Sequence, residues 1–200
     1  MILYVDNNFI SPYAMSAYVS LRAKNLNFTI KTINLNINQN KENNFLSFTR
    51  RVPTLETNDF SLSESSAISE YLDERYPDNN IYPKSLNERA RAREIQAWLR
   101  SDLLALRNER STETIFIKPT NKPLSEEAKE SASKLVQATN SLLFENKMNL
   151  FSEWCIADVD LSLMLNRLIL NGYEVSDTLR RYVEHQWKNE FIQDWIKLRK

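Results

Sequence analysis

A Val-Pro step and a Glu-Ser pair in the first half of the chain are the residues best suited to bind a ligand. Proline rarely begins a strand, so Val52-Pro53 indicates that the backbone before the strand serves another purpose. If this X–Pro bond is cis, the N–H and C=O of Val52 point away from the sheet and can pair with an extended peptide. Glu64 and Ser65 begin an apolar-periodic helix, whose free N–H groups and dipole favour a carboxylate. Together the two motifs predict a site for a short, extended, acidic peptide.

Ser11 and Pro12 are typical of a helix start, with serine at the N-cap and proline in the first turn. From this pattern alone, Ser11 is a plain helix cap. An apolar run at residues 2–5 predicts a buried strand before the helix, and residues 28–33 alternate as a second strand would. Because a helix connects these two strands, we expect them to be parallel and central in the sheet. Two short strands joined by residues 58–59 complete an α/β domain.

The composition changes after Tyr76, where Pro77 and Pro83 bracket a polar segment typical of a linker. No strand candidate follows residue 82. The sequence therefore predicts an α/β domain at residues 1–76, a linker at 77–84 and an all-helical domain at 85–200. Helices are expected at residues 87–109, 125–146, 157–171 (closed by Asn171-Gly172), 176–189 and 190–198.

The composition excludes several functional classes. The 200 residues are 42% hydrophobic, carry a formal net charge of zero and contain no Lys/Arg block, which argues against nucleic acid as a partner. No apolar run approaches the ~18 residues of a membrane span, and the N-terminus shows no secretory signal. Cys155 is the one cysteine and fits a reducing compartment, so we expect a cytoplasmic protein. With His185 as the one histidine, we expect no metal site.

These motifs resemble the cytosolic glutathione transferases, and the resemblance covers essentially the whole chain. It rests on Ser11-Pro12-Tyr13, on Val52-Pro53 followed by Glu64-Ser65, and on the run Cys155 to Asp158. Strings such as Arg-Arg-Val-Pro and Leu-Ser-Glu-Ser-Ser-Ala-Ile look most like the bacterial YfcF-type transferases. The resemblance implies a thioredoxin-like N-terminal domain, an all-helical C-terminal domain and a homodimer. It also implies glutathione as co-substrate, with no further cofactor.

The resemblance assigns the chemistry to Ser11. Its hydroxyl would donate to the sulfur of bound glutathione, and the helix N-terminus would add partial positive charge, so that the thiolate is favoured. Each unit by which the pKa of the thiol falls needs only ~1.4 kcal/mol. Tyr4 and Tyr13 are alternative hydroxyl donors. We expect Tyr4 to lie in the core and Tyr13 to line the site.

The binding residues follow from the same resemblance. The backbone of Val52-Pro53 would hold the peptide, Glu64 and Ser65 would bind its γ-glutamyl end, and Arg51 would help to hold the glycyl carboxylate. If residues 50–51 are strand, only one of Arg50 and Arg51 faces the site. In the family's helical folding motif a hydroxyl residue caps a helix and an aspartate reaches back to it. Here that motif has cysteine at position 155 in place of the hydroxyl residue.

The electrophile pocket is expected between the domains, on the long helix, where Leu104 and Arg107 are the candidates together with Leu103 and Arg110. The implied activity is conjugation of glutathione to small electrophiles or reduction of hydroperoxides. The alternative is a non-catalytic glutathione-binding, carrier or assembly module of the same fold. In the implied homodimer, charges on the long helix of one subunit would face charges on the other subunit. The paired sets are Arg89, Arg91 and Arg93 on one side and Glu70, Asp73 and Glu74 on the other.

Overall fold

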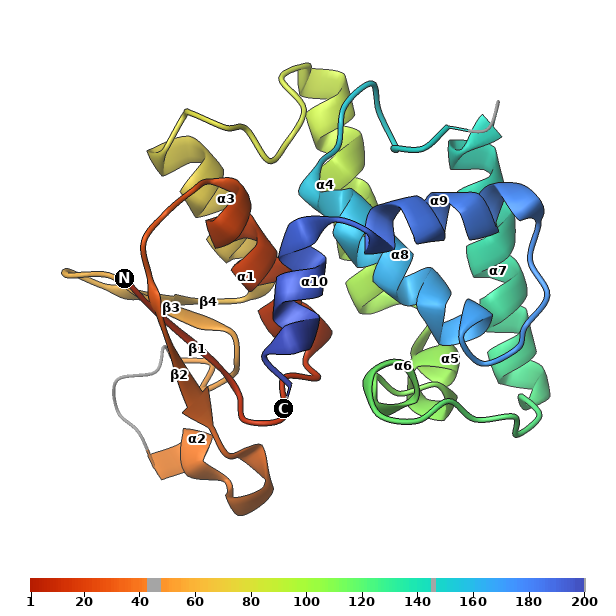
Figure 1. Cartoon of the computed structure of the whole chain (residues 1–200), viewed down its shortest axis with the longest axis horizontal. Coiled ribbons are helices and arrows are strands. Elements are labelled where there is room, and N and C mark those ends of the chain that lie inside the picture. The colour runs from red at the N-terminus through yellow and green to blue at the C-terminus, as the bar shows by residue number, and fades with distance from the viewer. Residues whose placement is uncertain (43–47, 145–146, 200) are drawn as a thin grey trace. The chain divides into compact units, whose positions relative to one another are not determined.

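The computed structural model of the chain describes residues 1–42, 48–144 and 147–199 (Figure 1). The chain forms two compact units. The first comprises Met1–Ile81 together with Glu190–Lys200, and the second comprises Tyr82–Asn189. The first unit is built from a sheet and helices, while the described part of the second is helical. The predicted fold class, an α/β domain followed by an all-helical domain, is confirmed.

In the described part of the first unit, the sheet has four strands in the order β2-β1-β3-β4. As expected, β1 and β2 pair in parallel, but β3 pairs antiparallel with both β1 and β4. The prediction that the parallel pair is central was wrong, because the chain after β2 returns on the other side of β1 in the reverse direction. The strands are β1 Ile2–Asp6, β2 Thr29–Ile33, β3 Thr54–Glu56 and β4 Ser61–Ser63.

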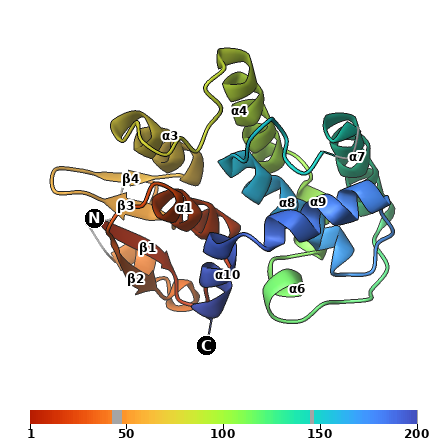
Figure 2. The ribbon, with the colours of Figure 1, turned by 45° about the horizontal axis from the view of Figure 1, so that its top comes forward.

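Two long helices of the first unit, α1 (Pro12–Ala23) and α3 (Ser65–Arg75), pack on each other (Figure 2). The C-terminal helix α10 (Glu190–Lys197) packs on α1. Trp195 of α10 is fully buried, and its ring lies 5.4 Å from that of Tyr18. By packing, α10 thus joins the first unit, although its sequence follows the helical segment. The turn η1 (Leu35–Ile37) and the short helix α2 (Gln39–Glu42) lead from β2 toward β3.

The second unit is built around α8 (Ile156–Ile169), which is buried along most of its length. Leu161, Leu165 and Leu168 are fully buried in it, as are Leu135 of α7 and Tyr182 of α9. The other helices of this unit are α4 Leu86–Ser101, α5 Leu104–Glu109, α6 Glu113–Phe116, α7 Glu126–Leu142 and α9 Asp177–Trp187.

The long helix expected at residues 87–109 is broken in the structure into α4 and α5. The break lies at Leu103, which adopts a left-handed backbone with φ 61°. Asp102 stabilises it by accepting hydrogen bonds from Trp98 Nε1 at 2.9 Å and Leu103 N at 2.7 Å, and by pairing with Lys134 of α7. These contacts, that of Lys134 first, lower the pKa of Asp102 to about 2. The helix expected to run to residue 146 ends at Leu142, and residues 145–146 lie outside the described part.

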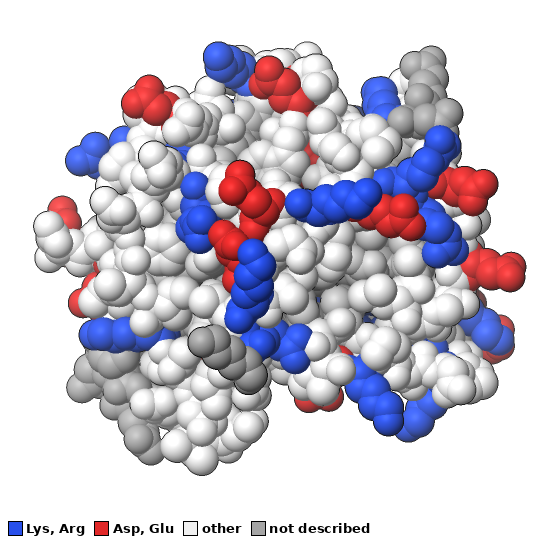
Figure 3. All heavy atoms as spheres, in the orientation of Figure 1, with Lys and Arg blue, Asp and Glu red and all other residues white. Residues whose placement is uncertain are grey.

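Acidic and basic side chains are interspersed on the face of the molecule shown in Figure 3, in keeping with the zero net charge. Within the described ranges, the structure contains no helix that is both long enough and apolar enough to cross a membrane.

Candidate functional site

One edge of the sheet gathers the three segments that the sequence predicted to bind a ligand. In the register, Tyr4 of β1 lies opposite Thr54 of β3, and Thr54 lies opposite Ser63 of β4. Because β3 runs antiparallel to both neighbours, the chain leaves β1, enters β3 and leaves β4 at the same edge. The predicted site residues lie in the segments next to these points: Ser11 and Tyr13 after β1, Arg51, Val52 and Pro53 before β3, and Glu64 and Ser65 after β4.

Ser11 is the N-cap of α1, and Pro12 is the first residue of the helix. The Oγ of Ser11 accepts the backbone N–H of Ala14 at 3.2 Å. A hydroxyl that accepts in this way keeps its own proton for a second hydrogen bond, so Ser11 can still donate to a ligand. Ser11 and Tyr13 are both half-buried. The helix start therefore offers a hydroxyl donor in the positive field of the helix dipole.

Tyr4 is not available as a hydroxyl donor to a ligand. Its side chain is 2% exposed, and its hydroxyl donates to Glu56 Oε2 at 2.5 Å. Burial, together with the neighbouring Glu56 carboxylate, raises the pKa of Tyr4 to about 12. The prediction that Tyr4 lies in the core is confirmed.

The Val52-Pro53 peptide bond is cis, and Pro53 is buried. Val52 is half-buried and packs against Tyr4 and Ile33. The hydroxyl of Thr54, the residue after Pro53, donates to the carbonyl oxygen of Arg51 at 2.7 Å. The turn before β3 is thus fixed by apolar packing and by a side-chain hydrogen bond.

Arg50 and Arg51 are not strand residues, so the expected alternation between them does not apply. Arg50 has a left-handed backbone with φ 52°, and its guanidinium donates to the carbonyl oxygen of Lys41 at 2.9 Å. The carbonyl of Arg50 in turn accepts from Asn40 Nδ2 at 2.9 Å. Both arginine side chains are exposed, and the structure ties Arg50 to the α2 segment.

Glu64 caps α3 with φ 71° and ψ 117°, a backbone conformation that a non-glycine residue rarely adopts. Such a conformation costs of order 1–3 kcal/mol, and residues of this kind cluster at functional sites. Glu64 is exposed, whereas Ser65, the first residue of α3, is 2% exposed. The carbonyl of Ser65 accepts from Ser69 Oγ, which also lies 2.8 Å from Ser20 Oγ of α1. The helix that begins at Ser65 is thereby hydrogen-bonded to the helix that Ser11 caps.

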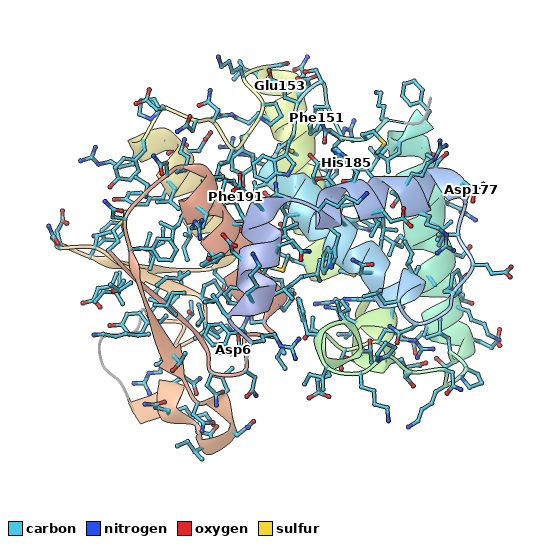
Figure 4. The ribbon with its side chains drawn as sticks, in the orientation of Figure 1. Asp6, Phe151, Glu153, Asp177, His185 and Phe191 are labelled. Atoms are coloured by element: carbon cyan, nitrogen blue, oxygen red, sulfur yellow. The ribbon has the colours of Figure 1, made fainter. Side chains whose placement is uncertain are left out.

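The structure adds one residue that the sequence did not indicate. Asp6, at the end of β1, is 4% exposed, and its carboxylate accepts the backbone N–H groups of Ile10 and Ser11 (Figure 4). The only local signal is an aspartate between a strand and a helix cap, which is too common a pattern to single out.

The candidates for the electrophile pocket divide into two kinds. On α5, Leu104 is 60% exposed and Arg107 is half-buried. Leu103 and Arg110 are buried within the second unit at 1% and 6% exposure. The guanidinium of Arg110 donates to the carbonyl oxygens of Glu109 and Lys122, so it is occupied within its own unit. Leu104 and Arg107 therefore remain the candidates.

The Cys155 to Asp158 motif forms a complete capping box at the start of α8. The Asp158 carboxylate accepts the N–H of Cys155 at 2.9 Å, and the sulfur faces the backbone N–H of Asp158. Burial raises the pKa of the Cys155 thiol well above its usual range, which keeps it protonated and unreactive. Within the residues that the structure describes, no group of three or more His, Cys, Asp and Glu could hold a metal ion. His185 is exposed on α9 (Figure 4).

Comparison with solved structures supports the same fold. A glutathione transferase homolog from Burkholderia gl BGR1, with bound glutathione, is 40% identical with a TM-score of 0.81. The match covers 98% of this chain and 95% of that one. The holo structure of maleyl pyruvate isomerase, a bacterial zeta-class protein, matches with a TM-score of 0.75. That match covers 98% of this chain and 96% of the isomerase, and at 19% identity it shows the fold alone.

Curated relatives match over about half of this chain. The maleylacetoacetate isomerase of Dictyostelium discoideum is 35% identical over 94 residues, which are 45% of this chain and 43% of that protein. Glutathione S-transferase theta-2 of Homo sapiens is 34% identical over 100 residues, which are 48% of this chain and 40% of that protein. The aligned segments thus span less than half the length of these two relatives.

Two family matches together cover nearly the whole chain. Residues 9–80 match the family described as Glutathione S-transferase, N-terminal domain. Residues 85–200 match the family described as Glutathione S-transferase, C-terminal domain. The chain therefore belongs to the glutathione S-transferase family.

Proposed function

We propose that the first unit binds glutathione and that its thiolate, stabilised by Ser11, attacks small electrophiles or reduces organic hydroperoxides. One observation carries this proposal. A helix cap with a free hydroxyl proton, the backbone before a cis proline and the start of α3 all lie at one edge of the sheet. This edge offers a thiolate stabiliser, a partner for an extended peptide and a site for a carboxylate within a single unit. The relative from Burkholderia gl BGR1, similar over nearly its whole length, holds glutathione.

Each part of glutathione is matched to residues whose polar groups can bind it. The backbone of Val52 pairs with the peptide, and the start of α3 at Ser65, with Glu64 beside it, takes the γ-glutamyl end. Arg51, which is exposed, takes the glycyl carboxylate, and Tyr13 lines the thiol region. For the electrophile we propose Leu104 and Arg107, because their side chains are not buried in the second unit.

Titration calorimetry with glutathione tests the proposal directly. A dissociation constant for glutathione in the millimolar range or lower is expected for a site of this kind. If millimolar glutathione produces no heat beyond dilution, the proposal fails. If glutathione binds but neither a chlorodinitrobenzene electrophile nor a hydroperoxide is consumed faster than in a protein-free control, the chain is a non-catalytic binding module instead.

Ser11→Ala is expected to raise the pKa of the bound thiol by about one unit, because the anion loses a charge-assisted hydrogen bond. At saturating glutathione and at pH values below the thiol pKa of the wild type, conjugation should slow about tenfold, because the thiolate fraction falls by that factor. The affinity for glutathione measured by calorimetry should stay nearly unchanged. The measurement is the rate of conjugation to the same electrophile between about pH 6 and 8, a range chosen around the shifted thiol pKa.

Ser125→Ala is the matched control for this substitution. Ser125 caps α7 in the same way, since its Oγ accepts the N–H of Ala128 at 3.2 Å. Its hydroxyl also donates to Glu109 Oε1 at 2.5 Å, so Ser125→Ala is the stricter control for loss of stability. Each variant loses an N-cap bond, which costs about 1 kcal/mol of stability. The pH–rate profile should change in Ser11→Ala alone. An unchanged profile in Ser11→Ala would remove Ser11 from the chemistry.

We also propose a twofold homodimer in which α3 and β4 of one subunit face α4 of the other. Asp73 does not take part in the charge contacts expected between subunits, because it is 4% exposed and forms an ion pair with Lys24 of its own chain. Light scattering at several concentrations should give about twice 23.5 kDa. A mass that stays at 23.5 kDa throughout would exclude the dimer.

Three finer assignments complete the proposal. As sequence domains, the limits 1–76 and 85–200, joined by a linker at 77–84, are supported by the family matches to residues 9–80 and 85–200, although α10 packs in the first unit. A YfcF-type subclass is supported by the Arg-Arg-Val-Pro and Leu-Ser-Glu-Ser-Ser-Ala-Ile strings. A cytoplasmic location is supported by the free thiol of Cys155. Each assignment has its own test. Absence of cleavage between residues 77 and 84 in limited proteolysis would contradict the linker, a substrate profile unlike that of YfcF-type enzymes would contradict the subclass, and recovery outside the cytoplasmic fraction would contradict the location.

A further inference from the structure

The carboxylate of Asp6 is buried at the end of β1, where it binds only backbone N–H groups among the described residues. Its Oδ2 accepts from Ile10 N at 2.8 Å and its Oδ1 from Ser11 N at 3.1 Å. The side chain is 4% exposed, and no Lys or Arg of the described part pairs with it. A buried charge satisfied by two main-chain donors ties down the segment that supplies them.

The segment between Asp6 and Ser11 is also held at Phe9. Phe9 has a left-handed backbone with φ 51°, and its N–H donates to the carbonyl of Asp6 at 3.1 Å. The ring of Phe9 meets the buried Trp195 of α10 edge-on at 5.4 Å. The loop is therefore fixed by aromatic packing at Phe9, while Ser11 is held both by its cap bond to Ala14 and by the Asp6 carboxylate.

A negative charge beside a thiolate site opposes the chemistry proposed above. On charge alone, the Asp6 carboxylate would raise the pKa of a nearby thiol, since like charges disfavour ionisation. Its burial at this point is explained if it serves to place the hydroxyl of Ser11. A displacement of about 1 Å in a reacting group can cost on the order of a hundredfold in rate.

We propose that Asp6 is a positioning residue, which holds Ser11 in place for the thiol of bound glutathione through the N–H groups of Ile10 and Ser11. This inference rests on the proposed function. It assigns Asp6 no contact with glutathione, and its effect passes through Ser11.

The test is the pH–rate profile of Asp6→Ala with glutathione and the chlorodinitrobenzene electrophile. Positioning predicts that the apparent pKa of the thiol rises and that the rate at neutral pH falls about tenfold, as in Ser11→Ala. Loss of the charge alone predicts the opposite sign, a lower pKa. Asp6→Asn, which keeps one acceptor oxygen, should show a smaller rise. A lowered or unchanged pKa in Asp6→Ala would overturn the inference.

The double variant Asp6→Ala/Ser11→Ala separates positioning from a general loss of structure. If Asp6 acts through Ser11, adding Asp6→Ala to Ser11→Ala should leave the rate within about twofold, because interacting sites are not additive. An equal further loss in both backgrounds would contradict the inference. Asp59→Ala, which removes an exposed carboxylate from the β3–β4 hairpin, is the control and should leave the rate unchanged.

A readout without glutathione distinguishes failure of this inference from failure of the proposed function. The N–H of Ala14 donates to Ser11 Oγ, so its NMR chemical shift and hydrogen exchange report the position of Ser11. Both should change in Asp6→Ala and remain as in the wild type in Asp59→Ala. An unperturbed Ala14 in Asp6→Ala overturns the inference even where glutathione binds normally. If Asp6→Ala does not fold, Asp6→Asn is measured in the same way.

Discussion

Replacing Asp158 with alanine is expected to lower the free energy of unfolding by about 3–5 kcal/mol, because three buried donors lose their acceptor at once. The Asp158 carboxylate is fully buried and accepts from Leu150 N and Tyr182 Oη at 2.8 Å and from Cys155 N at 2.9 Å. An unsatisfied buried donor costs about 1–3 kcal/mol. With a total stability of about 5–15 kcal/mol for a typical protein, this loss is a large share.

Asp158→Asn is the matched variant, because it keeps most of the shape and part of the bonding. Leu150 and Tyr182 both donate to Oδ1, and an amide oxygen in that place would keep these two bonds. The amide NH2 would then face the N–H of Cys155, so that bond is lost. Burial raises the pKa of Asp158 against the pull of these hydrogen bonds, because taking a carboxylate out of water disfavours its charged form. Removing the charge offsets part of the loss in the asparagine variant.

Urea denaturation followed by circular dichroism measures both variants. The expected order of stability is wild type, then Asp158→Asn, then Asp158→Ala, with similar m-values. If the alanine variant loses less than about 1 kcal/mol, the hydrogen bonds of Asp158 do not anchor the start of α8. The same order should appear in the thermal midpoints, since one kcal/mol shifts the midpoint of a protein of this size by about 2–4 °C.

The features that the sequence predicted correctly are those with a local cause. Ser11-Pro12 begins α1 because a serine at the cap and a proline in the first turn both favour that boundary. Asn171-Gly172 closes α8 because Gly172 readily adopts its φ of 77°. Val52-Pro53 and Glu64-Ser65 flank short strands whose pairing places them at one edge. Strand pairing thus gathers motifs that are each visible in a few residues.

The features that the sequence did not predict depend on partners far away along the chain. Leucine has no preference for the left-handed conformation that Leu103 adopts, and the break there is supported by Lys134 of α7. The amphipathic pattern predicted helix α10, but not that Trp195 packs against Phe9 and Tyr18 of the first unit. Periodicity shows which face of a helix is apolar, while the surface that covers it is set by the tertiary fold.

The buried pair Lys24–Asp73 is a further feature of this kind, and breaking it is expected to be as damaging as the loss of Asp158. The two side chains are 0% and 1% exposed, and Lys24 Nζ lies 3.0 Å from Asp73 Oδ1. The pair joins the end of α1 to α3. Lys24 also donates to the carbonyl of Asp78 at 2.9 Å, and Asp73 accepts the N–H of Ile81 at 2.8 Å.

Either single variant, Lys24→Met or Asp73→Leu, leaves one charge buried without its ionic partner and should cost about 3–5 kcal/mol. The double variant removes both charges, so it should cost much less than the sum of the two single losses. It should not regain wild-type stability, because the carbonyl of Asp78 and the N–H of Ile81 lose partners.

Urea denaturation of the wild type, both single variants and the double variant closes this cycle and gives the coupling energy between the two side chains. The exposed pair Lys129–Glu126 on α7, with side chains 52% and 86% exposed, supplies the control cycle. Water and salt screen that pair, so its coupling should be about 0.2–1 kcal/mol. The Lys24–Asp73 coupling should exceed it several-fold, because removing one buried charge leaves the other without its ionic partner in a medium of low polarity. Additive losses at Lys24 and Asp73 would show that the two side chains do not depend on each other, and that α1 and α3 are held together by their apolar and serine contacts alone.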